Sequence, residues 1–325
     1  LQLNSLQDLQ GYISIGQKLP SEFAYLKQAK RLNFYLGLDE LTSKMIQNWP
    51  LSKVTPKNTL INKFIFDIQN LEIFSNHYDK VVGIFSIEGD TFSGNIKSSN
   101  LDAIIRQDDS GFLKLELNNS RIQDASFLSQ KSNSSDMLDL NARLIINNSS
   151  LGDLQIQSLD MYLVKNKNLL TFNKVHLKSN LLSISPRSGE ENAYFSIDNR
   201  GELYKLRGSF TIKDSSRIPI VQNFANFSYF NGNVNLQWKN LQKLQNIEGS
   251  LEFILKDLLV ENKTSTSVAF TLLGVLNLKN ILGKVANLDL TLSEFTSTQL
   301  NRIEGDFIFN QSQARLASPM FIETN

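Results

Sequence analysis

Apolar and polar residues alternate along most of this chain with a period of two. In the segment that begins at Ile247, the residues Leu251, Phe253 and Leu255 fall on one side of an extended chain and Glu252 falls on the other. Successive side chains of a strand point to opposite faces of a sheet, so this alternation predicts strands with one dry and one wet face. The pattern therefore predicts a mainly β protein.

Similar runs follow one another from residue 60 onward, each ending in a turn rich in Asn, Ser, Asp or Gly. Few helical segments separate them, which favours an antiparallel meander and excludes parallel crossovers. The residues predicted to line the dry face are Phe64, Phe66, Ile68, Phe85, Ile87, Leu113, Leu115, Leu117, Leu144, Ile146, Phe172, Leu206, Phe210, Ile212, Val234, Leu236, Trp238, Leu251, Phe253, Leu255, Leu288, Leu290, Leu292, Phe307 and Phe309.

The wet face of the same strands carries charged and amide side chains. These are Lys114, Glu116, Arg143, Lys205, Arg207, Asn233, Asn235 and Gln237. A sheet with this pattern must shield its apolar face, and three arrangements do so. It can pack on a second sheet, close into a barrel, or curl into a trough that is filled by helices or lipid. The alternation alone leaves all three open.

A few short amphipathic helices are predicted between the strands. A strand over residues 32–38 is followed by a helix that Asp39 caps and Pro50 ends, and another helix begins after Ser267. Shorter helical candidates lie at residues 126–131 and after Pro219. Residues 1–19 predict two strands and a turn.

Composition bounds the domain count and the partners. With 325 residues, of which 41% are hydrophobic and 20% charged, the chain suffices for one large domain or two ordinary ones. We expect one domain over residues 1–325, with a possible division into 1–130 and 137–325 at the polar stretch between them. The 33 basic and 32 acidic residues are scattered, so nucleic acid is not expected as a partner.

Histidine and cysteine are too scarce for the usual catalytic and metal sites. The chain has no cysteine and two histidines, His77 in a predicted turn and His176 on a predicted solvated strand face. Neither has a neighbour at metal-ligand spacing, and a Ser-His-Asp triad would have only these two bases. We expect no catalytic residue, no metal and no cofactor.

Two acidic pairs are candidates for the carboxylates of a glycosidase. Asp108 and Asp109, and Glu190 and Glu191, lie in polar stretches beside Ser and Gly. Adjacent residues point to opposite sides of an extended chain, so loop charges are the favoured interpretation and a polysaccharide-active enzyme is the weaker one. Glycine-rich phosphate loops of either common type do not occur in the sequence.

Four segments resemble one known family. They are GNVNLQW from Gly232, IEGSLEF from Ile247, LLGVLNL from Leu272 and IEGDFIF from Ile303. In this order they are similar to the C-terminal part of the YhdP proteins of the AsmA-like superfamily. The resemblance covers roughly the last two thirds of the chain and contains no catalytic motif.

The resemblance implies a long, curled antiparallel sheet that forms a hydrophobic groove. It further implies a periplasmic segment that shields phospholipid acyl chains and conducts them between the inner and outer membranes. Partners would be phospholipid, the inner membrane through an anchor outside these residues, and the outer membrane or its proteins. The alternative is a closed, non-catalytic sandwich or solenoid module of a surface or envelope protein, whose apolar face is its own core.

Overall fold

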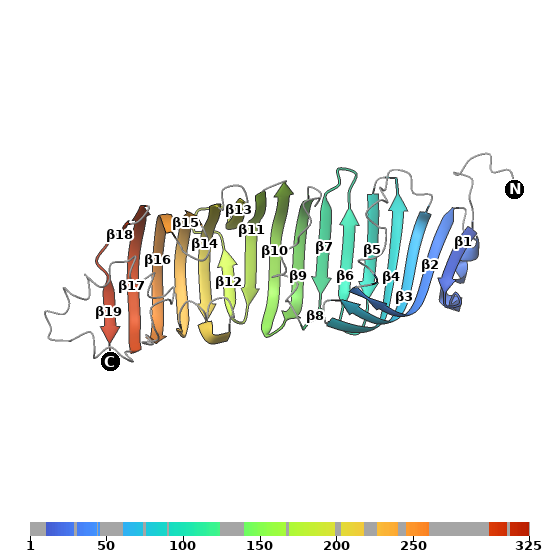
Figure 1. Cartoon of the computed structure of the whole chain (residues 1–325), viewed down its shortest axis with the longest axis horizontal. Coiled ribbons are helices and arrows are strands. Elements are labelled where there is room, and N and C mark those ends of the chain that lie inside the picture. Colours follow the sequence, from blue (N-terminus) through green and yellow to red (C-terminus); the bar gives the residue numbers. More distant parts are fainter. Residues whose placement is uncertain are drawn as a thin grey trace. The chain divides into compact units, whose positions relative to one another are not determined.

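The structure is a computed structural model that describes residues 11–28, 31–43, 45, 61–73, 76–89, 91–123, 140–166, 169–198, 203–217, 226–239, 245–259, 299–310 and 313–324. The described part forms one mixed sheet of 19 strands with very little helix (Figure 1). The prediction of a mainly β chain built on one large sheet is confirmed. The chain divides into two units, residues 1–158 and residues 159–325.

Unit 1 is built largely from hairpins. Its strands are β1 (Gly11–Gly16), β2 (Leu32–Thr42), β3 (Ile61–Ile73), β4 (Asn76–Glu88), β5 (Thr91–Lys97), β6 (Asp102–Gln107), β7 (Leu113–Asn118), β8 (Arg121–Ile122) and β9 (Leu140–Leu151). Strands β3 to β7 pair in chain order and antiparallel, and lie side by side in Figure 1. Short turns join them, as the Asn-, Ser- and Gly-rich segments between the strands predict.

The expectation that parallel pairing is excluded is wrong. Parallel pairs join β1 to β2, β2 to β3, β7 to β9 and β8 to β9. The chain between them is longer than a hairpin turn, over residues 17–31, 43–60 and 123–139. A parallel pair needs a connection that returns to the same end of the sheet, and a helix is only one way to provide it.

A short 3₁₀ helix, η2 (Ser21–Gln28), was not predicted. Phe23 and Leu26, three residues apart, stand on one side of η2 because a 3₁₀ helix repeats every three residues. They pack on Tyr35 of β2 and Ile65 of β3, and all four side chains are buried. Here the sheet is covered on the face opposite to Phe64. The described part of residues 1–19 contains one strand, β1.

The predicted helix after Asp39 begins later than expected. Strand β2 continues to Thr42, because β3 supplies backbone partners as far as the pair of Thr42 and Glu72. Helical residues follow at Ser43 and Met45, and the Oγ1 of Thr42 accepts a hydrogen bond from the Met45 N–H (3.4 Å). The capping residue is therefore Thr42, because pairing with β3 overrides the local cap signal of Asp39.

Unit 2 holds the remaining strands. They are β10 (Leu154–Asn166), which spans the boundary, β11 (Leu169–Ser179), β12 (Leu182–Ser185), β13 (Tyr194–Asp198), β14 (Leu203–Lys213), β15 (Tyr229–Lys239), β16 (Gln245–Leu259), β17 (Gln299–Asn310), β18 (Gln313–Leu316) and β19 (Phe321–Thr324). The registers from β11 to β19 are antiparallel. The short strands β12 and β13 both pair with β11 and β14, and β18 and β19 both pair with β17.

In each unit, the alternation of side chains between the two faces is interrupted at one position along a pair of strands. In unit 1, Ile68 and Leu71 of β3 share one cluster with Tyr78 and Val81 of β4, although the members of each pair are three positions apart. Lys80, between the two β4 residues, has a left-handed backbone (φ 51°). Such an irregularity bends the strand and shifts the alternation by one residue. The apolar residues on either side of Lys80 therefore lie on the same side of the strand.

Unit 2 has the same feature. Leu255 and Leu258 of β16 share a cluster with Leu300 and Ile303 of β17. Asp257, next to Leu258, has a φ of 53°. These breaks agree with a curled sheet, because a flat sheet with an uninterrupted pleat would place each pair on opposite faces.

Several predicted elements lie outside the described residues. They are the helix after Ser267, the strand with Leu288, Leu290 and Leu292, the helical candidates at 126–131 and after Pro219, and the polar stretch between 130 and 137.

Candidate functional site

One face of unit 1 is apolar from β2 to β9. Direct cross-strand partners form rows on this face. One row is Phe34, Phe64, Phe85, Gly94, Ile105, Leu115 and Leu144, and the next is Leu36, Phe66, Gly83, Ile96, Ala103, Leu117 and Ile146. Ile87, Phe92, Gln107, Leu113 and Ala142 form a third, and Leu38, Ile68 and Val81 a fourth. Gln107 is the one polar member of these rows. We call this surface the apolar face of unit 1.

The corresponding face of unit 2 runs from β11 to β19. Its rows are Leu170, Ile197, Tyr204 and Trp238; Phe172, Phe195, Leu206, Leu236, Gly249 and Phe309; Gly208, Val234, Leu251, Phe307 and Leu316; Ile184, Phe210, Gly232, Phe253 and Gly305; and Leu182, Ile212, Phe230, Leu255, Ile303 and Ile322. Apart from the hydroxyl of Tyr204 and the indole nitrogen of Trp238, these side chains carry no polar atom. This surface is the apolar face of unit 2.

The predicted lining residues that the structure describes all stand in these rows. Leu288, Leu290 and Leu292 lie outside the described residues. Ile68, Ile146, Val234, Trp238, Phe307 and Phe309 are buried, and the other described members are partly exposed. Each face is thus an apolar surface on which some side chains are buried and the others are partly exposed.

Strand β6 contributes to the apolar face of unit 1 and was not predicted. Ala103 and Ile105 belong to the face, whereas Ile104 points to the opposite side, across from Asn95 and Glu116. Because Ile104 and Ile105 are adjacent and both apolar, the sequence of β6 does not alternate between apolar and polar residues. The charged residues Asp102 and Arg106 flank this apolar group, and they could have indicated a short strand between them.

Phenylalanine rings cover the glycines of neighbouring strands. In unit 1, a Cβ on Gly83 would lie 2.2 Å from the ring of Phe66, and one on Gly94 would lie 2.2 Å from the ring of Phe85. In unit 2, a Cβ on Gly305 would lie 3.4 Å from the ring of Phe253 on the neighbouring strand β16. The rings therefore lean over the adjacent strand and close the gaps that glycine leaves.

These rings also contact one another across the strands. Ring centroids are 5.4 Å apart between Phe34 and Phe64, and 6.3 Å apart between Phe64 and Phe85. In unit 2, Phe253 lies 6.3 Å from Phe230 and 5.9 Å from Phe307, and both pairs are nearly parallel. Each unit thus has an aromatic band that crosses several strands and exposes little except hydrocarbon.

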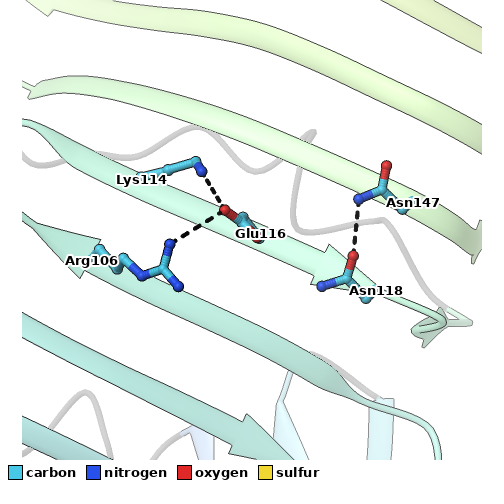
Figure 2. Close-up of polar contacts among 5 residues, drawn as sticks. All are labelled: Arg106, Lys114, Glu116, Asn118 and Asn147. Carbon is cyan, nitrogen blue, oxygen red and sulfur yellow. Dashed lines mark hydrogen bonds and ion pairs between the residues drawn. The ribbon is translucent and has the colours of Figure 1, made fainter.

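On β7 and β9 the opposite face of unit 1 carries mainly polar side chains. Figure 2 shows Glu116 of β7 between Lys114 and Arg106. The Nη1 of Arg106 lies 3.8 Å from the Oε1 of Glu116. Asn147 of β9 donates a hydrogen bond to the Oδ1 of Asn118 (2.9 Å). The register places Arg143 opposite Lys114. The hydrogen bond from Lys114, reinforced by the positive charges of Arg106 and Arg143, lowers the pKa of Glu116 below its usual value. This predicted wet face is stabilised by its own ion pairs.

The polar face of unit 2 is similar. Amides of Asn233 and Gln237 donate to Glu252 (2.9 Å) and Glu248 (2.6 Å) on the next strand. The Arg207 guanidinium donates two bonds to Glu190, at 2.9 and 2.7 Å, and this pairing lowers the pKa of that carboxyl. Glu190 is thus a partner of Arg207, as expected for a loop charge.

Asp108 and the histidines occupy structural or solvated positions. The Oδ1 of Asp108 accepts bonds from the backbone N–H groups of Ser110 (3.0 Å) and Phe112 (2.9 Å), which holds the turn between β6 and β7. His176 is exposed on β11, as predicted. His77 is also exposed, but it lies in β4 and not in a turn, because β4 pairs with β3 down to Asn76.

The Glu116 ion pairs make stability depend on pH. A carboxyl whose pKa is lowered by folding stabilises the native state above its unfolded pKa of about 4.3, and this contribution is lost as pH falls through the folded pKa. We expect Glu116→Gln to lower the free energy of unfolding by about 0.5–1 kcal/mol at neutral pH. The difference should disappear near pH ~2. Urea unfolding at several pH values measures it.

The matched control is Glu88→Gln, at the exposed end of β4 in the same unit. It should change the free energy of unfolding by less than ~0.5 kcal/mol. A Glu116→Gln effect of the same size at acidic and neutral pH would show that packing, and not the ion pairs, causes it.

Among the described residues, no three His, Cys, Asp or Glu side chains gather where they could hold a metal ion. The described helices are all too short or too polar to span a bilayer. A scan of family models finds no match to the chain. Searches among curated proteins and among solved structures find no match either.

Proposed function

We propose that this chain is a periplasmic segment of a lipid-conducting envelope protein of the YhdP-like, AsmA-like kind. In this proposal each apolar face shields phospholipid acyl chains on their way between the inner and outer membranes, and an anchor outside these residues holds the protein in the inner membrane. The supporting observation is that the rows of each face stay apolar from strand to strand within each unit, with Gln107 of β6 as the one exception. The resembling segments from Gly232, Ile247 and Ile303 are strands of the unit 2 face.

Continuity matters because of the cost of wetting a hydrocarbon chain. Each methylene exposed to water costs about 0.8 kcal/mol, so two chains of ~16 carbons represent on the order of 25 kcal/mol. A polar gap in the lining would restore part of that cost as a barrier. The rings over Gly83, Gly94 and Gly305 fill the places where such gaps would otherwise occur.

The face is also wide enough for a whole phospholipid. Along β17 it extends from Ile303 to Phe309, which is ~20 Å at the usual strand rise. Acyl chains can lie along the strands within that width. Head groups can then remain in solvent at the rim, so the proposal requires no basic cluster and no covalent step.

The alternative is a closed structural or binding module. In that case the partly exposed members of the faces would pack against other parts of the chain, and the purified protein would hold no lipid. Mass spectrometry of lipids extracted from the purified chain separates the two, because a closed core has no room for hydrocarbon tails.

The test compares two variants of β16, one with a new charge on the apolar face and one with a new charge on the polar face. Phe253 stands on the apolar face between Gly232 and Gly305, and Ile254 stands on the polar face between Asn231 and Glu304. We expect Phe253→Asp to reduce co-purified phospholipid roughly tenfold or more, because a carboxylate in an acyl-chain site must be desolvated. Ile254→Asp should retain the wild-type amount.

Circular dichroism verifies that both variants keep their strands. Undiminished lipid in the Phe253→Asp variant would show that the apolar face is not the binding surface. A wild-type chain free of phospholipid would favour the closed module.

A further inference from the structure

Trp238 lies at the rim of the apolar face of unit 2. It stands opposite Tyr204 of β14, and the two rings stack with centroids 5.7 Å apart and planes 15° apart. Its side chain is 7% exposed and packs with Ile247 and Phe309. The next residue, Lys239, is exposed and ends β15. Trp238 therefore lies at the end of the hydrocarbon lining, beside the end of β15.

The indole nitrogen of Trp238 is a buried donor without an acceptor. Its Nε1 is closed to solvent and has no hydrogen-bond partner among the described residues. Buried indole N–H groups normally find an acceptor, since leaving one unpaired is unfavourable. The other buried members of its cluster are Ile247, Phe307 and Phe309, whose side chains are hydrocarbon and cannot accept a hydrogen bond.

The geometry points to Trp238 as the donor that binds the ester carbonyl at the head of an acyl chain. This inference rests on the proposed function and specifies its ligand as an ester-linked acyl lipid. From Trp238 the apolar face continues along β15 over Leu236 and Val234 to Phe230, a distance of ~27 Å. An acyl chain laid on this path has its carbonyl at Trp238 and its head group in solvent near Lys239.

Two lysolipids that differ only in the carbonyl test this directly. The probes are 1-palmitoyl-lysophosphatidylglycerol and its 1-O-hexadecyl ether analogue, used as monomers with the full chain. By calorimetry, the wild type should bind the ester about fivefold more tightly than the ether, the usual gain from one neutral hydrogen bond. Trp238→Phe keeps an aromatic ring against Tyr204 but lacks the N–H, so it should bind both equally.

A second measurement does not depend on the folding of that variant. Trp49 is the other tryptophan, and a Trp49→Phe chain leaves one indole N–H signal in a proton–nitrogen spectrum. That signal should move on binding of the ester and move much less with the ether.

Equal binding of ester and ether by the wild type, with an unmoved indole signal, overturns the role of Trp238 while leaving lipid binding intact. An ester preference that persists in Trp238→Phe also overturns it. Failure of the wild type to bind either lysolipid overturns the proposed function together with this inference.

Discussion

Replacing Phe307 by alanine is expected to lower the free energy of unfolding by about 3–5 kcal/mol, the usual cost of removing a buried aromatic ring. Phe307 is 1% exposed and contacts Phe253 and Phe309, with ring centroids 5.9 and 6.3 Å away. Its ring also covers Gly305, so its loss leaves a cavity that neighbouring backbone cannot fill. Urea unfolding followed by circular dichroism measures the change.

Phe321→Ala in the same unit is the matched control. Phe321 is 52% exposed on β19, opposite Glu304 on the polar face. Its loss should change the free energy of unfolding by less than ~0.5 kcal/mol. Similar effects of the two substitutions would mean that Phe307 is not packed in the floor of the apolar face.

Gly249→Ala is expected to destabilise the chain by about 2–6 kcal/mol. Gly249 has a φ of 124°, which L-residues rarely adopt, and a Cβ there would lie 1.9 Å from the backbone oxygen of Asn235. The strained backbone costs about 1–3 kcal/mol and the clash a similar amount, because a paired strand cannot move away. The result is read from the urea midpoint or, for a larger loss, from failure to fold.

Gly189→Ala isolates the steric part of this effect. Gly189 lies in a turn of the same unit, also with a positive φ (80°), but has no atom within 4 Å of the added Cβ. It should cost only about 1–2 kcal/mol, the backbone penalty alone. Equal losses at the two glycines would contradict the close approach of β15 to β16.

Local alternation predicted the strands and their faces well where every second residue is apolar. Phe64, Phe66, Leu251 and Phe253 were assigned to one face from sequence, and the registers place them in the rows described above. It failed where apolar residues are adjacent, as at Ile104 and Ile105, and where a left-handed residue shifts the pleat, as at Lys80. At Ile104 an apolar residue lies on the polar face, and at Lys80 the backbone shifts the alternation by one residue.

The partners of each strand were less accessible from sequence than its faces. Nothing in the alternation of β2 distinguishes a parallel neighbour from an antiparallel one, since both bury the same side chains. The direction of β3 relative to β2 depends on where the long connection returns. The extension of β2 to Thr42 likewise reflects pairing with β3, which outweighs the helical signal after Asp39.

By itself, the sequence determined that this protein is a chain of strands with one hydrocarbon face and one polar face, because side-chain chemistry at alternate positions is a local property. Only the tertiary structure decided which strands are neighbours, where the pleat breaks, which glycines lie under aromatic rings, and that the Trp238 nitrogen is buried without an acceptor. Those features arise from contacts between residues far apart in the chain, which no local pattern contains.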